Sequence, residues 1–412
     1  MLRWLAAAAA LVSMAACGDE GAERAAQEAW SRIEAAHAAA PYTAALSERI
    51  AERAKAVAAL DEYARKFSST AHVREKATQA AEIRARFAAE KKLQASMPCL
   101  APPHRACLIA EAEKRIQART EFEAEQVAAL LAATGDRRHE TRLLGLLKAD
   151  ARIDSIGRVI VAAGAARSAA ALEALAAYGG RQAIHSEAAA IVAHVRGDGT
   201  AYAAEIERFR AAGRLGHRAA RAIARHTADR TLFAEAIRQI RAMEPGLESS
   251  SELGLTMADM AAAGLAEDVW TIDPAAGPTR PDPVWAYAAH LQAAGQRKDG
   301  ARLDALLKAE IVLGTGGRPV PLPKAGAFVN AWTAYALARL ERIEEAKALI
   351  RDQRIDARRA PPALTEIALW HARQGRMREA LDVVFAIEAE LEGLGNLTPL
   401  IAALLGLAAA GP

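Results

Sequence analysis

Apolar residues recur at helical spacing in the first hundred residues. The clearest stripe consists of Ile50, Ala54, Val57, Leu60 and Tyr63. Steps of three and four positions place such residues on one face of a helix. Pro41 and Pro98 interrupt the pattern, so we predict three helices, over about 22–39, 44–67 and 73–95. These are typical of a helical hairpin region with charged faces in water, although the narrow stripe also allows a coiled-coil contact with a partner.

Beyond about residue 108 the apolar pattern becomes a series of helix pairs. The segment AWTAYALARLERIEEAKALI (331–350) is matched 34 residues later in register by residues of EIALWHARQGRMREALDVVF (366–385). A glycine or polar residue returns between successive helical stretches. The predicted turn positions are Gly135, Gly164, Gly199, Asp229, Gly264, Gly295, Glu341 and Gly375. Small residues flank most of them, and helices packed side by side approach closest at small residues. We therefore predict stacked helix pairs that share one core.

This pattern resembles the tetratricopeptide repeat, a helix-turn-helix unit. Ala368, Gly375 and Ala380 hold the small residue of the first helix, the turn glycine and the alanine of the second helix. The resemblance covers roughly 108–412 and is specific in the last two or three units; elsewhere the family aromatics are missing, so other α-solenoid units are an alternative.

We therefore predict an all-α fold in which the N-terminal helical hairpins are followed by a solenoid. For the solenoid, the resemblance implies a right-handed α-α superhelix of roughly 34-residue helix-turn-helix units. The first helices would line a concave face that binds peptides or protein segments. The last segment, NLTPLIAALLGLAAAG, is predicted to be an apolar capping helix, and 311–327, rich in glycine and proline, a long loop.

The chain begins like an exported protein. Arg3 precedes thirteen uncharged residues, 4–16, a run too short to span a membrane. Met14-Ala15-Ala16-Cys17 resembles a bacterial lipobox, although Met14 replaces the usual leucine. The resemblance implies that 1–16 is a signal peptide and that Cys17 carries lipid, and Gly18 implies the outer membrane, facing the periplasm. The alternative is cleavage after Ala15, which gives a soluble periplasmic protein.

The three cysteines support the lipid anchor. An odd number leaves one thiol unpaired in an exported chain. If Cys17 is lipidated, Cys99 and Cys107 remain to form a disulfide across a Pro-rich loop. The alternative is a metal site that includes His104, but no fourth ligand lies nearby, so we predict no metal. The chain then divides into a signal peptide (1–16), a lipid-anchored helical region (17–97) and a solenoid (98–412).

Composition and motifs exclude several functions. The 53 basic residues nearly balance the 50 acidic ones, which argues against a nucleic-acid surface, and 25% charged residues argue against a membrane-embedded bundle. The motifs HExxH, GxSxG, CxxCH and GxGxxG are absent. Glu248-Ser249 does not continue the pattern of superhelical lytic transglycosylases. We therefore expect no catalytic activity and no cofactor.

The remaining candidate is a binding surface on the first helices. It consists of Arg196, His226, Trp285, Gln292, Trp332, Tyr335, Arg339 and Arg373. Arginines can bind carboxylates and aromatic side chains can anchor a peptide, although solvated basic positions and core aromatics explain the same residues. We predict an adaptor for envelope proteins or peptides. The alternatives are an accessory or catalytic protein of peptidoglycan metabolism, a soluble periplasmic scaffold and a self-associating structural protein.

Overall fold

The computed structural model is almost entirely helical, which confirms the predicted all-α class. It describes residues 2–120, 122–148, 168–170, 172–173, 186–272, 279–312, 319–321, 324–356, 358–391 and 396–410. For residues 2–19, 147–148, 186–188 and 312 only the backbone is described. The side chain of Cys17 and the predicted turn at Gly164 therefore lie outside the described part. Contacts divide the chain into two units, 1–97 and 98–412.

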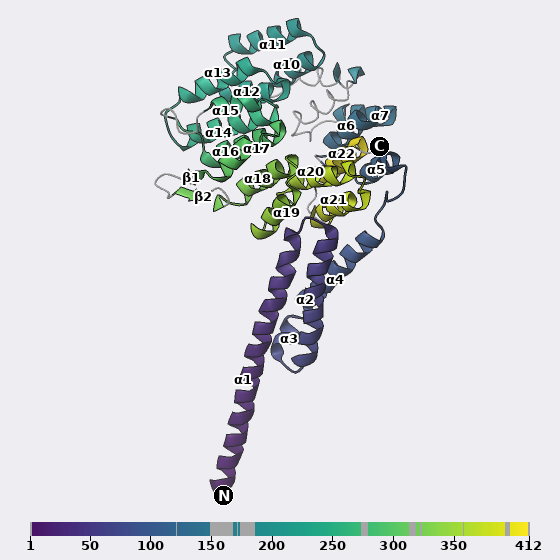
Figure 1. Cartoon of the computed structure of the whole chain (residues 1–412), viewed down its shortest axis with the longest axis vertical. Helices are drawn as coiled ribbons and strands as arrows, with labels where there is room; N and C mark the ends of the chain where they lie inside the picture. Colours follow the sequence, from purple (N-terminus) through teal and green to yellow (C-terminus); the bar gives the residue numbers. More distant parts are fainter. Residues whose placement is uncertain are drawn as a thin grey trace. The chain divides into compact units, whose positions relative to one another are not determined.

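The first unit contains the three long helices that the apolar pattern predicts. Its elements are α1 (Leu2–Ala39), the 3-10 helix η1 (Ala40–Tyr42), α2 (Leu46–Lys66), α3 (Ala71–Glu75) and α4 (Ala77–Ala95). The short helix α3 takes the first turn of the predicted third helix. In Figure 1, α1 and α2 run side by side, and contacts place α4 against α2 as well. Trp30, Leu60 and Ile83 join these three helices in one small core.

Two arginines lie in the buried face of α2, where the predicted stripe is only partly confirmed: Leu60 and Tyr63 are buried, whereas Ile50, Ala54 and Val57 stay partly accessible. The buried residues are Leu46, Arg49, Arg53, Ala56, Leu60 and Tyr63. Arg53 is 1% exposed. Its Nε lies 2.6 Å from Glu90 Oε2 of α4, and its Nη1 lies 2.8 Å from His37 Nδ1 of α1. Burial and the charge of Arg53 lower the pKa of His37 to about 4, so the ring is neutral. A buried guanidinium is tolerated here because both neighbours pair with it.

The second unit stacks helix pairs in sequence order. Its helices are α5 (His104–Lys114), α6 (Glu123–Thr134), α7 (Arg137–Lys148), α10 (Ser186–Val195), α11 (Gly199–Ala211), α12 (His217–Thr227), α13 (Arg230–Arg241), α14 (Leu247–Ala262), α15 (Ala266–Thr271), α16 (Pro283–Arg297), α17 (Gly300–Leu307), α18 (Ala327–Arg339), α19 (Ile343–Asp352), α20 (Pro361–Arg373), α21 (Met377–Leu391) and α22 (Thr398–Ala410). The even-numbered helices from α10 to α22 pack one against the next, and we call them the first-helix layer. Each even-numbered helix from α10 to α20 also packs against the helix that follows it in sequence.

Turn residues with positive φ separate the helices of most described pairs. Gly264 and Gly375 have φ of 81° and 73°, a region that favours glycine because it has no Cβ. The predicted turn at Gly295 is wrong, because Gly295 lies inside α16 and the left-handed residue is Lys298. Gly264 and Lys298 are then 34 residues apart, the same interval as that between Glu341 and Gly375.

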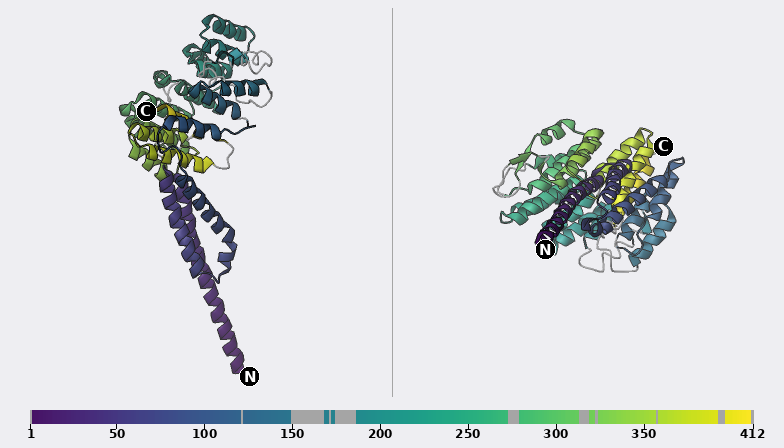
Figure 2. Two further views of the ribbon diagram at one scale, coloured as in Figure 1. Left: turned by 90° about the vertical axis from the view of Figure 1, so that its right-hand side faces the viewer. Right: turned by 90° about the horizontal axis from the view of Figure 1, so that it is seen from below.

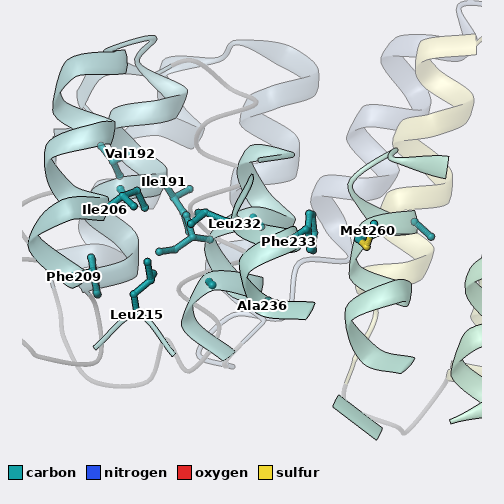
Figure 3. Packing of buried hydrophobic residues seen from close by; sticks show 14 of the residues in the cluster. Ile191, Val192, Ile206, Phe209, Leu215, Leu232, Phe233, Ala236 and Met260 are labelled. Atoms are coloured by element: carbon teal, nitrogen blue, oxygen red, sulfur yellow. The ribbon is translucent and has the colours of Figure 1, made fainter. Parts of the chain in front are cut away.

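A continuous apolar core runs through the first half of this unit. Its buried residues come from α6, α7 and α10 to α16, with Leu172 between them. Figure 3 shows Ile191 and Val192 of α10 beside Ile206 of α11, and Leu232 and Phe233 of α13 further along. No single helix pair encloses these residues, so each pair depends on its neighbours for burial.

The last helix, α22, is helical as predicted but does not cap the outer end of the array. It packs against α20 and α21 and also against α5 and α6 (Figures 1 and 2). Gln126 Nε2 of α6 donates to Thr398 Oγ1 at 3.2 Å, and the Leu397 amide donates to Gln117 Oε1 at 2.8 Å. Because α22 carries no charge and is apolar on most sides, it needs cover on more than one face.

The segment predicted as one long loop contains a short pair of strands. β1 (Glu310–Val312) pairs antiparallel with β2 (Pro319–Pro321), with Ile311 opposite Val320. Tyr287 of α16 donates from its hydroxyl to the Glu310 carbonyl oxygen at 3.3 Å. Within the described ranges, no helix has the length and apolar content that crossing a membrane requires.

Candidate functional site

Four aromatic side chains line up on two neighbouring helices of the first-helix layer. Trp285 belongs to α16, and Phe328, Trp332 and Tyr335 belong to one face of α18. The rings of Trp285 and Phe328 lie 4.7 Å apart and those of Trp332 and Tyr335 5.5 Å apart, both edge to face. All four side chains stay partly accessible, and Phe328 is 39% exposed. We call these four residues the aromatic row.

Two glycines let the helices approach closely enough to hold this row. A Cβ on Gly254 of α14 would lie 2.8 Å from Trp285 Cβ. A Cβ on Gly295 would lie 3.0 Å from Ala336 Cα and 3.1 Å from Tyr335 Cε1. Gly295 therefore serves helix packing, which explains why it is not a turn.

Arg339 lies at the end of α18 and is partly neutralised. Its Nη1 donates to both carboxylate oxygens of Glu366 on α20, at 3.2 Å each, whereas its buried Nε has no hydrogen-bond partner. Burial raises the pKa of Tyr335 nearby; the Arg339 charge opposes this shift and Glu366 adds to it. The Tyr335 hydroxyl therefore stays protonated and can donate a hydrogen bond.

Arg373 occupies the equivalent position at the end of α20 and differs from Arg339. Its side chain is exposed, and within the described residues no ion pair or hydrogen bond engages its guanidinium. The two predicted arginines thus stand on neighbouring helices, but Arg373 is the one with its donors available to a ligand.

The other predicted residues lie elsewhere in the same layer. Gln292 is partly buried on α16, His226 is partly buried on α12, and Arg196 is exposed just after α10. Burial, helped by Arg225, lowers the pKa of His226 to about 4. No described hydrogen bond, ion pair or ring contact joins these three residues to the aromatic row, so the candidate surface is confined to α16, α18 and α20.

Sequence reasoning missed an ionic ladder between α12 and α14. Arg218 Nε lies 2.7 Å from Glu252 Oε1, and Arg221 Nε and Arg225 Nη1 lie 3.1 and 3.0 Å from Asp259. Burial raises the pKa of Asp259. Burial acts in the same direction on Glu252, but hydrogen bonds from Arg218 and Arg221 outweigh it and lower the pKa of that carboxyl. The sequence did contain a signal for this ladder. The three arginines are spaced three and four residues apart and the two acids seven apart, so each set lies on one face of its helix. The ladder joins two helices of the layer by charge-assisted hydrogen bonds.

The predicted pairing of Cys99 with Cys107 is present as a disulfide, with Cα atoms 5.4 Å apart. His104 Nδ1 is hydrogen-bonded to the Cys99 carbonyl oxygen at 2.8 Å. Because the two sulfurs are bonded to each other, they are not available as thiolate ligands to a metal. Within the described residues, no group of three His, Cys, Asp or Glu side chains is arranged to hold a metal ion.

No known protein family, curated protein or solved structure matches this chain.

Proposed function

We propose that this chain is a lipoprotein of the cell envelope, anchored through Cys17, that binds other envelope proteins through its helical-repeat unit. The anchor rests on Met14-Ala15-Ala16-Cys17 and on the disulfide. Since Cys99 and Cys107 pair with each other, Cys17 is the one cysteine of three left for another role. A structural disulfide also suits an oxidising compartment such as the periplasm, and we propose the outer membrane as the site of the anchor.

The N-terminal hairpin would act as a spacer in such a protein. In α1, residues 17 to 39 are continuous helix. At 1.5 Å per residue this segment extends about 33 Å, so lipid at Cys17 would be held well away from the turn at η1. A helix fixes the distance between its two ends, whereas a flexible linker with the same number of residues lets that distance vary.

The aromatic row carries the binding part of the proposal. It combines partly exposed tryptophan, phenylalanine and tyrosine rings with donors on Tyr335 and Arg373 that no described residue engages. Tryptophan, tyrosine and arginine are enriched among the few residues that dominate the binding energy of protein interfaces. The row is also preorganised, because Gly254 and Gly295 allow the helices beneath it to pack closely. The partners we propose are peptides or protein segments of the envelope, bound without chemical conversion.

Affinity capture from solubilised membranes tests the binding surface. The test variants are Trp332→Ala and Arg373→Glu, and the matched control is Arg378→Glu, an exposed arginine on the outer helix α21. We expect each test variant to weaken capture of a specific partner at least about tenfold, which corresponds to 1.4 kcal/mol. The control should capture normally, and circular dichroism should show unchanged helicity. Equal capture by Arg373→Glu and Arg378→Glu would remove the support for this surface.

Membrane fractionation of Cys17→Ala tests the anchor separately. The variant should leave the membrane fraction and remain soluble, while its binding in vitro is unchanged. Retention in the membrane fraction would show that Cys17 is not the anchor, whatever the capture experiment finds. Turnover of peptidoglycan by the purified chain would instead favour the enzymatic alternative.

A further inference from the structure

A small apolar pocket lies between α13, α14 and α15, on helices that do not carry the aromatic row. Its volume is about 150 Å³. Phe233 and Ile237 of α13, Met260 of α14, and Leu265 and Ile272 beside α15 form its apolar wall. Phe233 and Met260, both labelled in Figure 3, are 1% and 4% exposed, so this wall is part of the packed core.

Opposite charges stand at the edge of this pocket. Arg230 and Asp268 both line it, and Arg230 Nε lies 3.0 Å from Asp268 Oδ2. Arg230 is the first residue of α13, and its place is set by Asp229, which accepts from the amides of Thr231 and Leu232. The Arg230 position is therefore fixed at its backbone, while 69% of its side chain is exposed.

Both charged groups have unused hydrogen-bonding capacity. Asp268 Oδ2 is buried and forms an ion pair with Arg230 Nε at 3.0 Å, yet among the described residues it accepts no hydrogen bond. The terminal amino groups of Arg230 have no described partner. A ligand ammonium group could donate the hydrogen bond that this buried, ion-paired carboxylate oxygen lacks. A ligand carboxylate could in turn accept hydrogen bonds from the two terminal amino groups of the Arg230 guanidinium.

We propose that this pocket binds a free aliphatic α-amino acid of the size of leucine, isoleucine or methionine. The alkyl side chain fills the apolar wall, the carboxylate pairs with Arg230 and the ammonium group pairs with Asp268. An apolar cavity of about 150 Å³ accepts a molecule as large as benzene, which is close to the size of a butyl group. A long acyl chain exceeds this volume. In an α-amino acid the ammonium and carboxylate groups are bonded to the same carbon atom, so their short separation matches that of the Asp268 carboxylate and the Arg230 guanidinium.

Ligands that lack one feature at a time test the assignment on the full chain in detergent. Thermal shift and calorimetry would compare L-leucine with N-acetyl-leucine, leucinamide, N-acetyl-leucinamide and glycine. We expect leucine to bind, each singly blocked compound to bind at least about tenfold more weakly, and glycine not to bind. Binding of N-acetyl-leucinamide as tight as that of leucine would show a site for a peptide side chain instead. No shift with leucine up to about 50 mM would overturn the proposal.

Substitutions then place the ligand in this pocket. Ala234→Phe on α13 should fill the pocket and abolish leucine binding, whereas Ala203→Phe on α11, another exposed alanine, should not. In Arg230→Ala, leucine and leucinamide should bind alike, because the carboxylate has lost its partner. In Asp268→Asn, leucine and N-acetyl-leucine should bind alike. Unchanged selectivity in both charge variants would contradict the proposal, even if Ala234→Phe failed to fold. Capture through the aromatic row should be unaffected in every variant.

Discussion

The close approach of α14 and α16 gives the sharpest prediction, because one methyl group tests it. Replacing Gly254 by alanine places a Cβ 2.8 Å from Trp285 Cβ and 3.2 Å from the Asp282 carbonyl oxygen. Neither neighbour is the flexible end of a side chain, so the helices must move apart. Overpacking of this kind costs about 1–3 kcal/mol. The alanine also gains about 0.8–1 kcal/mol of helix propensity, so we expect a net loss of roughly 1 kcal/mol in the free energy of unfolding.

Gly145 is the matched control. It lies inside α7, its φ is not in the left-handed region, and a Cβ there would meet nothing within 4 Å. Gly145→Ala should therefore raise the free energy of unfolding by up to about 1 kcal/mol, through helix propensity alone. The two variants share the same chemical change, so the difference between them measures packing.

Urea unfolding of the full chain, followed by circular dichroism and tryptophan fluorescence, measures both variants. Gly254→Ala should unfold at lower urea than the natural chain and Gly145→Ala at higher urea, with unchanged slopes. Because Trp285 moves with α16, Gly254→Ala should also weaken partner capture by the aromatic row. If Gly254→Ala stabilised the chain as much as Gly145→Ala, the reasoning that these helices are in close contact would be refuted.

Three further predictions concern other parts of the second unit. Replacing Cys99 and Cys107 by serine should lower the free energy of unfolding by roughly 2–3 kcal/mol, because the disulfide closes a nine-residue loop and so restricts the unfolded chain. Reductant should destabilise the natural chain but not the variant, and an unchanged urea midpoint in the variant would contradict this prediction. Arg115 Nη2 of α5 lies 2.9 Å from Glu388 Oε2 of α21. A double-mutant cycle with Arg115→Ala and Glu388→Ala should therefore give a coupling free energy of about 1 kcal/mol. If the two substitutions lower the free energy of unfolding additively, this contact between α5 and α21 does not form. Burial, helped by Arg302, lowers the pKa of His290 from its usual 6.5 to about 4, so the neutral ring stabilises the fold above pH 6.5 and this stability, up to about 3 kcal/mol, is lost as pH falls toward 4. His290→Gln should therefore make the free energy of unfolding depend less steeply on pH between 6.5 and 4. The same pH dependence in the natural chain and the variant would reject this prediction.

Most of the candidate surface could be read from the sequence because it depends on local spacing. Trp332, Tyr335 and Arg339 recur at three- and four-residue steps, which places them on one face of any helix that contains them. Arg373 stands 34 residues after Arg339, which gives it the same place in the next unit. What spacing could not show is that Glu366 neutralises part of Arg339, whereas no described carboxylate pairs with Arg373.

Sequence by itself therefore determined the class of the fold, the helices of the first unit, the disulfide partners and several turns. These features depend on helical periodicity, on prolines and glycines that end helices, and on the number of cysteines. Predictions failed where one feature allowed two uses, as at Gly295, which could serve as a turn or as a close contact.

Only the tertiary structure decided which distant segments meet. It buried Arg53 between His37 and Glu90, placed α22 against α5 and α6, and brought α13, α14 and α15 around one pocket. In each case the partners come from separate helices, and burial or pairing with the partner sets the energy. Helical periodicity states which face of a segment needs cover, whereas the packing of the whole chain selects the segment that covers it.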